Sequence, residues 1–254
     1  SFPTRRSSDL TFIGFHNFSS LLQDKNFYTA LQNSTIHIGI ALPGVILPGF
    51  MLGYFLSRKP PGCRFLRAVF FSPVMISVAA LSMIFLGVYL PDGIINNILR
   101  FMGLQDWTRV WLADPDTVLA SIIVVDLWAG IGFYSVLFFA ALSNLPDHLL
   151  DAAKIDGAGD WTIMWKIAFP YILDFVGVST VLHFLWLLLG SAQNVLLLTR
   201  GGPGTYSLTL GYFLYDLAFV GKRLGYSQAL GVGIFVIGVA GLLVIRKLTR
   251  RSYS

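Results

Sequence analysis

The feature that most constrains this fold is a set of five apolar stretches, each long enough to cross a lipid bilayer as a helix. A bilayer core needs about 20 helical residues. The stretches cover residues 30–56, 68–90, 117–143, 170–198 and 228–245. Continuous apolar runs of this length favour helices over the short alternating strands of a membrane barrel. The sequence therefore predicts an all-α, polytopic helical bundle.

The composition indicates that this bundle is solvated by lipid. Hydrophobic residues make up 55% of the chain and charged residues only 12%, whereas soluble domains carry about 25% charged residues. The net charge of +5 comes from short basic runs beside apolar stretches, where such runs signal topology rather than nucleic-acid binding. We expect membrane lipid as a partner and no nucleic acid.

The basic residues also predict the orientation of the chain. Loops after the first, third and fifth stretches hold Arg58, Lys59, Arg64, Arg67, Lys154, Lys166, Arg246, Lys247, Arg250 and Arg251. The other loops hold Lys25, Arg100, Arg109, Arg200, Lys222 and Arg223. Since the basic excess faces the cytoplasm, we expect a multi-pass protein of the plasma (inner) membrane with a cytoplasmic C-terminus. This orientation puts residues 11–29 outside, so we expect one further span before them.

The domain is predicted to cover residues 11–251 as one transmembrane unit. Residues 1–10, SFPTRRSSDL, resemble a translated sequencing adapter and are excluded from the fold. Cys63 is the only cysteine of the chain, so no intrachain disulfide and no cysteine metal site is expected.

The loop between the third and fourth stretches, residues 146–170, reads as two helices rather than as a flexible connector. Asn144 is a candidate cap for a first helix running from about Pro146 to Ile155. Gly157 and Gly159 are expected to end it through left-handed backbone geometry, and Asp160 to cap a second helix.

Small side chains in the first of these helices suggest a protein contact. Ala152 and Ala153 leave a surface with almost no bulk, which another protein can approach closely. A short helix that continues through a second helix into a membrane span transmits movement better than a flexible loop. The loop is therefore a candidate coupling device, and a plain connector between two spans is the alternative interpretation.

The same loop resembles the signature of permease subunits of binding-protein-dependent ABC importers. That signature reads Glu-Ala-Ala, three residues, Gly, nine residues, Ile, one residue and Leu-Pro. With every spacing kept, the matching positions are Asp151, Ala152, Ala153, Gly157, Ile167, Phe169 and Pro170. Two positions depart from the signature, Asp151 for Glu and Phe169 for Leu. The first belongs to a trend of the whole chain, because all 13 acidic residues are Asp.

Two further segments resemble the sugar-importing branch of that family. Residues 198–203, LTRGGP, are similar to its Leu-Thr-x-Gly-Gly-Pro turn, and residues 225–230, GYSQAL, to its entry into the last span. The resemblance implies a transport path for a carbohydrate-like solute. It also implies a second permease subunit, cytoplasmic ATP-binding subunits and an external solute-binding protein. Asp151, Ala152, Ala153, Gly157, Ile167 and Pro170 are then the residues expected to couple to the ATPase.

Polar residues within the spans are candidates for the solute path. An ionisable side chain inside a bilayer costs about 2.5–3.5 kcal/mol on insertion scales, so Asp126 must face protein or water. Asp126 either hydrogen-bonds the solute or pairs with a polar group of another helix, and the sequence favours neither reading. Gln193 and Asn194 are the other candidates for solute hydrogen bonds, with bonding across helices as their alternative.

No catalytic site is expected. Asp174, Ser179 and His183 share one stretch, but nine residues at about 100° each place Asp174 and His183 on opposite helix faces. His183 is instead expected to be a packing residue with satisfied hydrogen bonds, with pore lining as the alternative. No phosphate-binding Gly-x-x-x-x-Gly-Lys-Ser/Thr motif occurs, so ATP hydrolysis must come from a partner. No cofactor and no metal are expected.

The alternative from another functional class is a secondary transporter or channel driven by an ion gradient. Such proteins carry paired intramembrane charges or discontinuous helices near the bilayer midplane. Here the sequence offers Asp126 as essentially one intramembrane charge. The pattern therefore favours the importer subunit.

Overall fold

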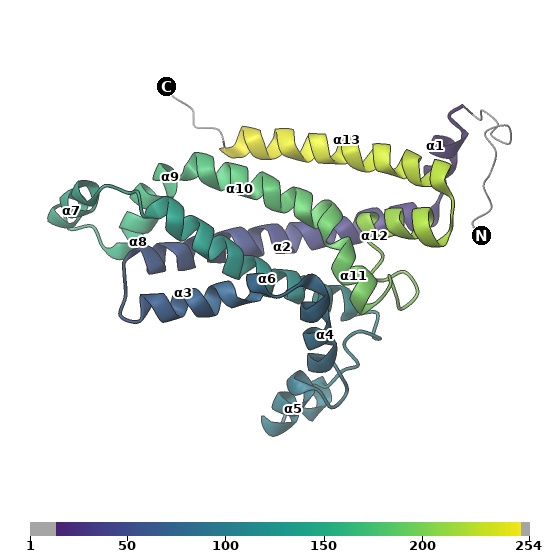
Figure 1. The fold of residues 1–254 in the computed structure, drawn as a ribbon, viewed down its shortest axis with the longest axis horizontal. Coiled ribbons are helices and arrows are strands. Elements are labelled where there is room, and N and C mark those ends of the chain that lie inside the picture. The colour runs from purple at the N-terminus through teal and green to yellow at the C-terminus, as the bar shows by residue number, and fades with distance from the viewer. Residues whose placement is uncertain (1–13, 250–254) are drawn as a thin grey trace.

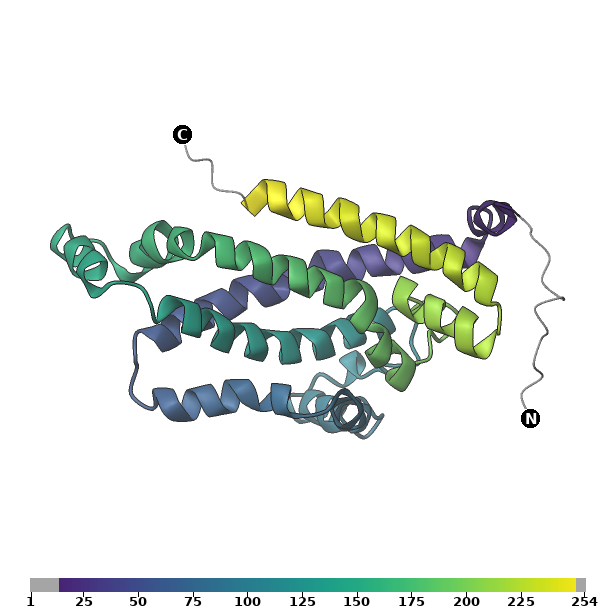
Figure 2. The same ribbon diagram turned by 45° about the horizontal axis from the view of Figure 1, so that its top comes forward.

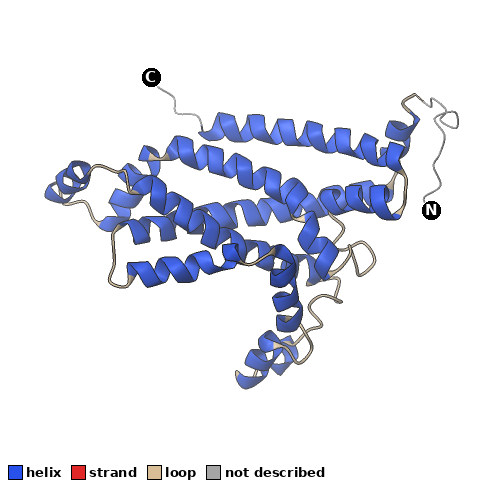
Figure 3. Ribbon diagram, viewed as in Figure 1, coloured by secondary structure: helices blue, strands red, loops and turns tan. Residues whose placement is uncertain are grey.

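The computed structural model describes residues 14–249, and within this range every regular element is a helix (Figure 3). The adapter-like residues 1–10, and any span before residue 11, lie outside the described residues. Four helices are long and apolar enough to cross a membrane: α2 (Lys25–Ser57), α6 (Val118–Leu142), the composite helix Leu173–Leu198, and α13 (Leu224–Thr249). They run roughly alongside one another and form the body of the molecule (Figures 1 and 2).

The stretch at residues 68–90 differs from the single helix that its composition suggests. It contains α3 (Cys63–Phe71), a 3₁₀ turn (Ser72–Met75) and α4 (Val78–Val88), and the chain bends by 99° between the two parts. Pro73 lacks the N–H that a continuing helix needs. Ser77 is extended, and its side chain accepts a hydrogen bond from the Ala80 N–H at 3.3 Å, which starts α4 as a new helix. Counted as one broken span, this pair is the fifth.

Shorter helices occupy the ends and connections of the bundle. They are α1 (His16–Leu21), α5 (Ile94–Phe101), α7 (Asp147–Ile155), α8 (Asp160–Ile163), α9 (Phe169–Tyr171), α12 (Leu210–Tyr215) and a 3₁₀ turn (Gln105–Trp107). The composite helix Leu173–Leu198 consists of α10 (Leu173–Leu185) and α11 (Ala192–Leu198). Three π-helical turns continue neighbouring helices, at Met164–Ala168, Trp186–Gly190 and Asp216–Val220. The second of them joins α10 to α11, which makes the composite span.

The most extensive contact between helices joins α2 to α6 and depends on glycine. A Cβ added to Gly53 would lie 2.8 Å from the Phe138 Cβ and 2.9 Å from the Phe139 backbone N, and one on Gly49 would lie 3.0 Å from the Tyr134 Cβ. Small residues one turn apart let two membrane helices approach closely. Phe50, between these glycines, is fully buried and packs edge-on against Phe138. This pair forms the rigid centre of the bundle.

The helix ends sort into two sides. The α2–α3 turn, α7 and the end of α13 lie together at one end, which we call the α7 end, while α1, α12 and the start of α13 lie at the opposite end (Figure 1). At that opposite end, α2 holds the turn before α12. The Asn33 amide donates to the carbonyls of Thr205 and Leu208 at 3.0 Å each, and the Leu210 N–H donates to the Ser34 hydroxyl at 2.8 Å.

Candidate functional site

Helix α7 projects from the end of the bundle and is closed by a glycine turn (Figure 1). Gly157 adopts a left-handed φ of +76°. Its N–H donates to the Lys154 carbonyl at 3.0 Å, and the Ala158 N–H donates to the Ala153 carbonyl at 2.9 Å. This hydrogen-bond pair is the Schellman ending of a helix, which requires a left-handed residue. Gly157 therefore ends α7 as the sequence predicts.

Three details of the predicted caps are wrong. Pro146, rather than Asn144, occupies the cap position of α7. Gly159 is extended, with φ of −72°, and caps α8, so it does not end α7 through left-handed geometry. Asp160 is the first residue of α8 instead of its cap. Gly159 has the extended backbone of a helix cap although it has no side chain to accept a hydrogen bond. Helix α8 therefore begins at Asp160, one residue earlier than predicted.

The signature residues of α7 divide into exposed and buried positions. Asp151, Ala152 and Gly157 are exposed, and Lys154 pairs with Asp151 at 3.3 Å. Ala153 is only 7% exposed and packs into the same apolar cluster as Tyr54 and Ile163. The expectation of an open surface at both alanines therefore holds for Ala152 alone, because the helix turns Ala153 toward the bundle.

The remaining signature residues connect α7 to the membrane helices. Ile167 is half-buried in the π-helical turn Met164–Ala168 and packs against the apolar cluster of α2 and α6. Pro170 is half-buried in α9. Phe169, where the signature has Leu, places its ring centroid 5.1 Å from that of Phe50 in the α2–α6 centre. The α7–α9 segment is thus packed onto the helices that it would have to move.

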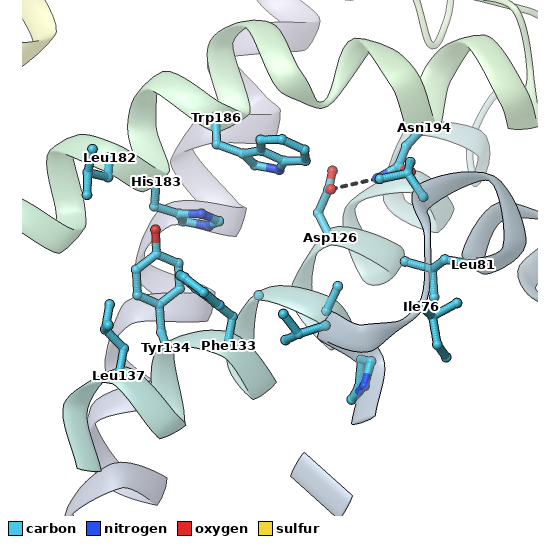
Figure 4. Close-up of a pocket in the computed structure, with 15 residues that line it drawn as sticks. Ile76, Leu81, Asp126, Phe133, Tyr134, Leu137, Leu182, His183, Trp186 and Asn194 are labelled. Carbon is cyan, nitrogen blue, oxygen red and sulfur yellow. Dashed lines mark hydrogen bonds between the residues drawn. The ribbon is translucent and has the colours of Figure 1, made fainter. Parts of the chain in front are cut away.

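A cavity of about 550 Å³ lies within the bundle, between the bent helix pair, α6 and α10 (Figure 4). Its walls are mainly apolar and aromatic, with contributions from Ile76, Leu81, Phe133, Tyr134, Leu182 and Trp186. Asp126, His183 and Asn194 supply polar groups. A pocket of this size with a few polar groups among aromatic walls has the dimensions and composition of a small-molecule site.

Asp126 lines this cavity and contacts polar side chains of two other helices. Its Oδ2 lies 2.8 Å from Nε2 of His37 on α2, and its Oδ1 accepts a hydrogen bond from the Asn194 side-chain amide at 2.7 Å (Figure 4). The three side chains are all buried. The sequence left open whether Asp126 pairs with another helix, and the structure contains that pairing.

Asn194 and Gln193 occupy different environments. The Asn194 amide binds Asp126, and its Oδ1 lies 3.5 Å from the Ser82 hydroxyl of α4, at the limit of a hydrogen bond. Gln193 is exposed and is not among the residues that line the cavity. His37 was not predictable as a functional residue, because a single histidine in an apolar stretch carries no motif.

His183 is buried at the cavity wall, but it is not the satisfied packing residue that the sequence predicts. Its Nε2 has no hydrogen-bond partner among the described residues, and its ring centroid lies 5.0 Å from that of Tyr134. Asp174 lines other grooves of the surface and not this cavity. No cluster of potential metal ligands occurs within residues 14–249.

Comparison with known proteins assigns the family. The family described as "Binding-protein-dependent transport system inner membrane component" matches residues 45–252. The probable ABC transporter permease protein YurN of Bacillus subtilis (strain 168) is 34% identical over 239 residues, covering 92% of this chain and 81% of that protein. The diacetylchitobiose uptake system permease protein NgcF of Streptomyces coelicolor is 30% identical over 260 residues, covering 96% and 73%.

A solved structure supports the fold. It is the crystal structure of a bacterial ABC transporter involved in the import of the acidic polysaccharide alginate, which matches with a TM-score of 0.86 and 23% identity over 96% of this chain and 85% of that chain. The bundle, the projecting α7 and the signature spacing agree with the family match. This chain therefore belongs to the family of binding-protein-dependent transport system inner membrane components, the permease subunits of ABC importers.

Proposed function

We propose that this chain forms the translocation path for a carbohydrate-like solute in an ATP-driven importer and couples that path to a cytoplasmic ATPase through α7. The observation that carries the proposal is the exposed surface of Asp151, Ala152 and Gly157 on a helix whose continuation is packed into the α2–α6 centre. A push on this helix reaches the membrane spans through close-packed side chains, which transmit displacement because packed cores deform little.

The assignment of a carbohydrate rests on two lines of support. The relative NgcF is named for the uptake of diacetylchitobiose, and the structural relative imports the polysaccharide alginate. The cavity offers aromatic faces from Tyr134 and Trp186, together with the unpartnered Nε2 of His183. Aromatic faces suit the apolar faces of sugar rings, and a buried nitrogen suits a hydroxyl.

The solute contacts proposed here extend those predicted from the sequence. Asp126 and Asn194 line the cavity and are hydrogen-bonded to each other, so we assign them to its wall in this conformation. His183 and Trp186 are the side chains that can turn toward a solute. The exposed Gln193 side chain does not line the cavity in this conformation. It would contact the solute only in another conformation of the protein.

The partners and orientation follow from the same proposal. The α7 end carries the basic α2–α3 turn and the basic end of α13, which supports a cytoplasmic location for this end and for the C-terminus. The ATP-binding subunits would dock there and hydrolyse ATP. The external solute-binding protein would meet the opposite end, and a second permease subunit would complete the path.

Bulk at Ala152 tests the coupling role. Ala152→Trp places a large ring on the exposed docking surface, so we expect the ATPase subunits to be lost when the permease is purified from membranes. Ala113→Trp is the matched control, because Ala113 is also exposed but precedes α6 at its other end. Equal ATPase retention in both variants would contradict the coupling role. Solute uptake that persists after deletion of the ATPase would instead support the transporter driven by an ion gradient.

Removal of the His183 nitrogen tests the solute site. In His183→Phe the hydrogen bond to the solute is lost together with the hydrogen bond to the Ala41 backbone, while an aromatic ring remains. A neutral hydrogen bond contributes about 0.5–1.5 kcal/mol, so the half-saturating solute concentration should rise about 2- to 10-fold. The control is Thr180→Val, since the Thr180 hydroxyl bonds only to the Val176 carbonyl of its own helix. Unchanged half-saturation in His183→Phe would remove this residue from the path.

A further inference from the structure

His37 lies outside the cavity yet is bonded to its wall. It comes from the middle of α2, is 1% exposed, and is not among the residues that line the cavity. Its Nε2 contacts Oδ2 of Asp126, which does line it. Any effect of His37 on a bound solute must therefore pass through Asp126.

The contact with His37 and the hydrogen bond from Asn194 together orient the Asp126 carboxylate. One carboxylate oxygen is held by His37 and the other by the Asn194 amide. These two contacts orient the carboxylate along the wall of the cavity, and the hydrogen bond to Oδ1 orients Asn194 in turn. Figure 4 shows Asp126 and Asn194 facing each other across the end of the cavity.

The same chain of contacts reaches the bent helix pair. Asn194 belongs to α11, and its Oδ1 faces the hydroxyl of Ser82 on α4 at 3.5 Å. Leu81, the neighbour of Ser82, lines the cavity. Four elements that are distant in sequence, α2, α6, α11 and α4, therefore meet in one line of buried polar side chains.

We propose that His37 is a positioning residue of the solute path. It holds the Asp126 carboxylate against Asn194 and so sets the wall of the cavity without touching the solute. The proposal rests on the proposed function, because it gives the cavity a role in solute passage. In His37→Ala the carboxylate loses this contact and can turn toward the cavity.

Charge removal distinguishes positioning from simple packing. In Asp126→Asn the new side-chain oxygen can still accept from Asn194, and its amide can donate to Nε2 of His37, so this change keeps the wall. In the double variant His37→Ala/Asp126→Asn no carboxylate is left without its partner, although the volume lost at His37 stays lost. A defect caused by the unpaired charge is therefore rescued by Asp126→Asn, whereas a defect caused by lost packing is not.

The experiment measures ATP-driven carbohydrate uptake by the complete complex in proteoliposomes. We expect His37→Ala to raise the half-saturating concentration about tenfold or more, and the double variant to recover most of that loss. His16→Ala, an exposed histidine on α1, is the matched control and should behave like the wild type. Should His37→Ala fail to assemble, recovery of assembled complex in the double variant is the equivalent result.

Two results overturn the proposal. The first is a His37→Ala variant with wild-type half-saturation, and the second is a double variant no better than His37→Ala in uptake or in assembly. Failure of the proposed function looks different, because the wild-type complex itself would then import no carbohydrate.

Discussion

Replacement of Gly157 by alanine should weaken coupling without disturbing the membrane helices. Gly157 has a φ of +76° and open space where a Cβ would go, so the substitution causes backbone strain and no clash. An L residue in the left-handed region costs roughly 1–2 kcal/mol. Because the segment can escape this strain by giving up the Schellman ending, α7 would lose the end geometry that presents Asp151 and Ala152.

The expected size of the effect follows from that strain. A change of one or two kcal/mol alters an equilibrium by a factor of about 5–30. The concentration of ATPase subunit that half-saturates the purified permease should therefore rise about 5- to 30-fold in Gly157→Ala. Gly157→Asn should lose less, since asparagine tolerates the left-handed conformation better.

Gly159 provides the matched control within the same loop. It also has open space at its Cβ position, but its φ of −72° is accessible to any residue. Gly159→Ala weakens only the N-cap of α8, at a cost of about 0.5–1 kcal/mol, so it should reduce ATPase binding less than Gly157→Ala does. If Gly157→Ala and Gly159→Ala bind the ATPase equally well, the argument from left-handed geometry is refuted.

Two further predictions concern the bundle and the exposed ion pair. Gly53→Ala inserts a Cβ 2.8 Å from the Phe138 Cβ and should cost about 1–3 kcal/mol of stability, which would lower the unfolding temperature in detergent. The control is Gly39→Ala, in open space on the same helix, which should leave that temperature unchanged. Equal unfolding temperatures for the two variants would contradict the packing argument. Asp151→Asn breaks an exposed ion pair with Lys154 that is worth about 0–1 kcal/mol, so the unfolding temperature should not change. Binding of the ATPase should fall, because the carboxylate lies on the proposed docking surface. Unchanged ATPase binding would remove the Asp151 carboxylate from that surface.

Much of the fold was predictable because lipid imposes simple rules on a chain. Backbone groups in a bilayer must bond within the segment, so long apolar runs become helices. The runs at residues 117–143 and 170–198 correspond closely to α6 and to the composite helix Leu173–Leu198. The bend between α3 and α4 was not predicted, because average hydropathy does not register a break made by Pro73 and a cap made by Ser77.

The candidate site was predictable only where local sequence carries a pattern. The spacing from Asp151 to Pro170 gave the α7 segment, and Asp126 stood out as a charge in an apolar run. The partner of Asp126 was not predictable, because His37 is 89 positions away and only the tertiary packing of α2 on α6 brings the two together. The burial of Ala153 was likewise decided by packing, since neighbouring alanines on a helix face different directions.

The proposed coupling requires α7 to lie on the cytoplasmic side of the membrane, where an ATPase can bind it. The direct test is labelling of Ala152→Cys with a membrane-impermeant maleimide, in a Cys63→Ser background, with Ala113→Cys as the marker for the other side. We expect Ala152→Cys to react with the maleimide in inside-out vesicles only, and added ATPase to protect it from the reaction. Ala113→Cys should react in intact cells. Reaction of Ala152→Cys from outside intact cells, or no reaction from either side in membranes stripped of ATPase, would contradict the proposed coupling.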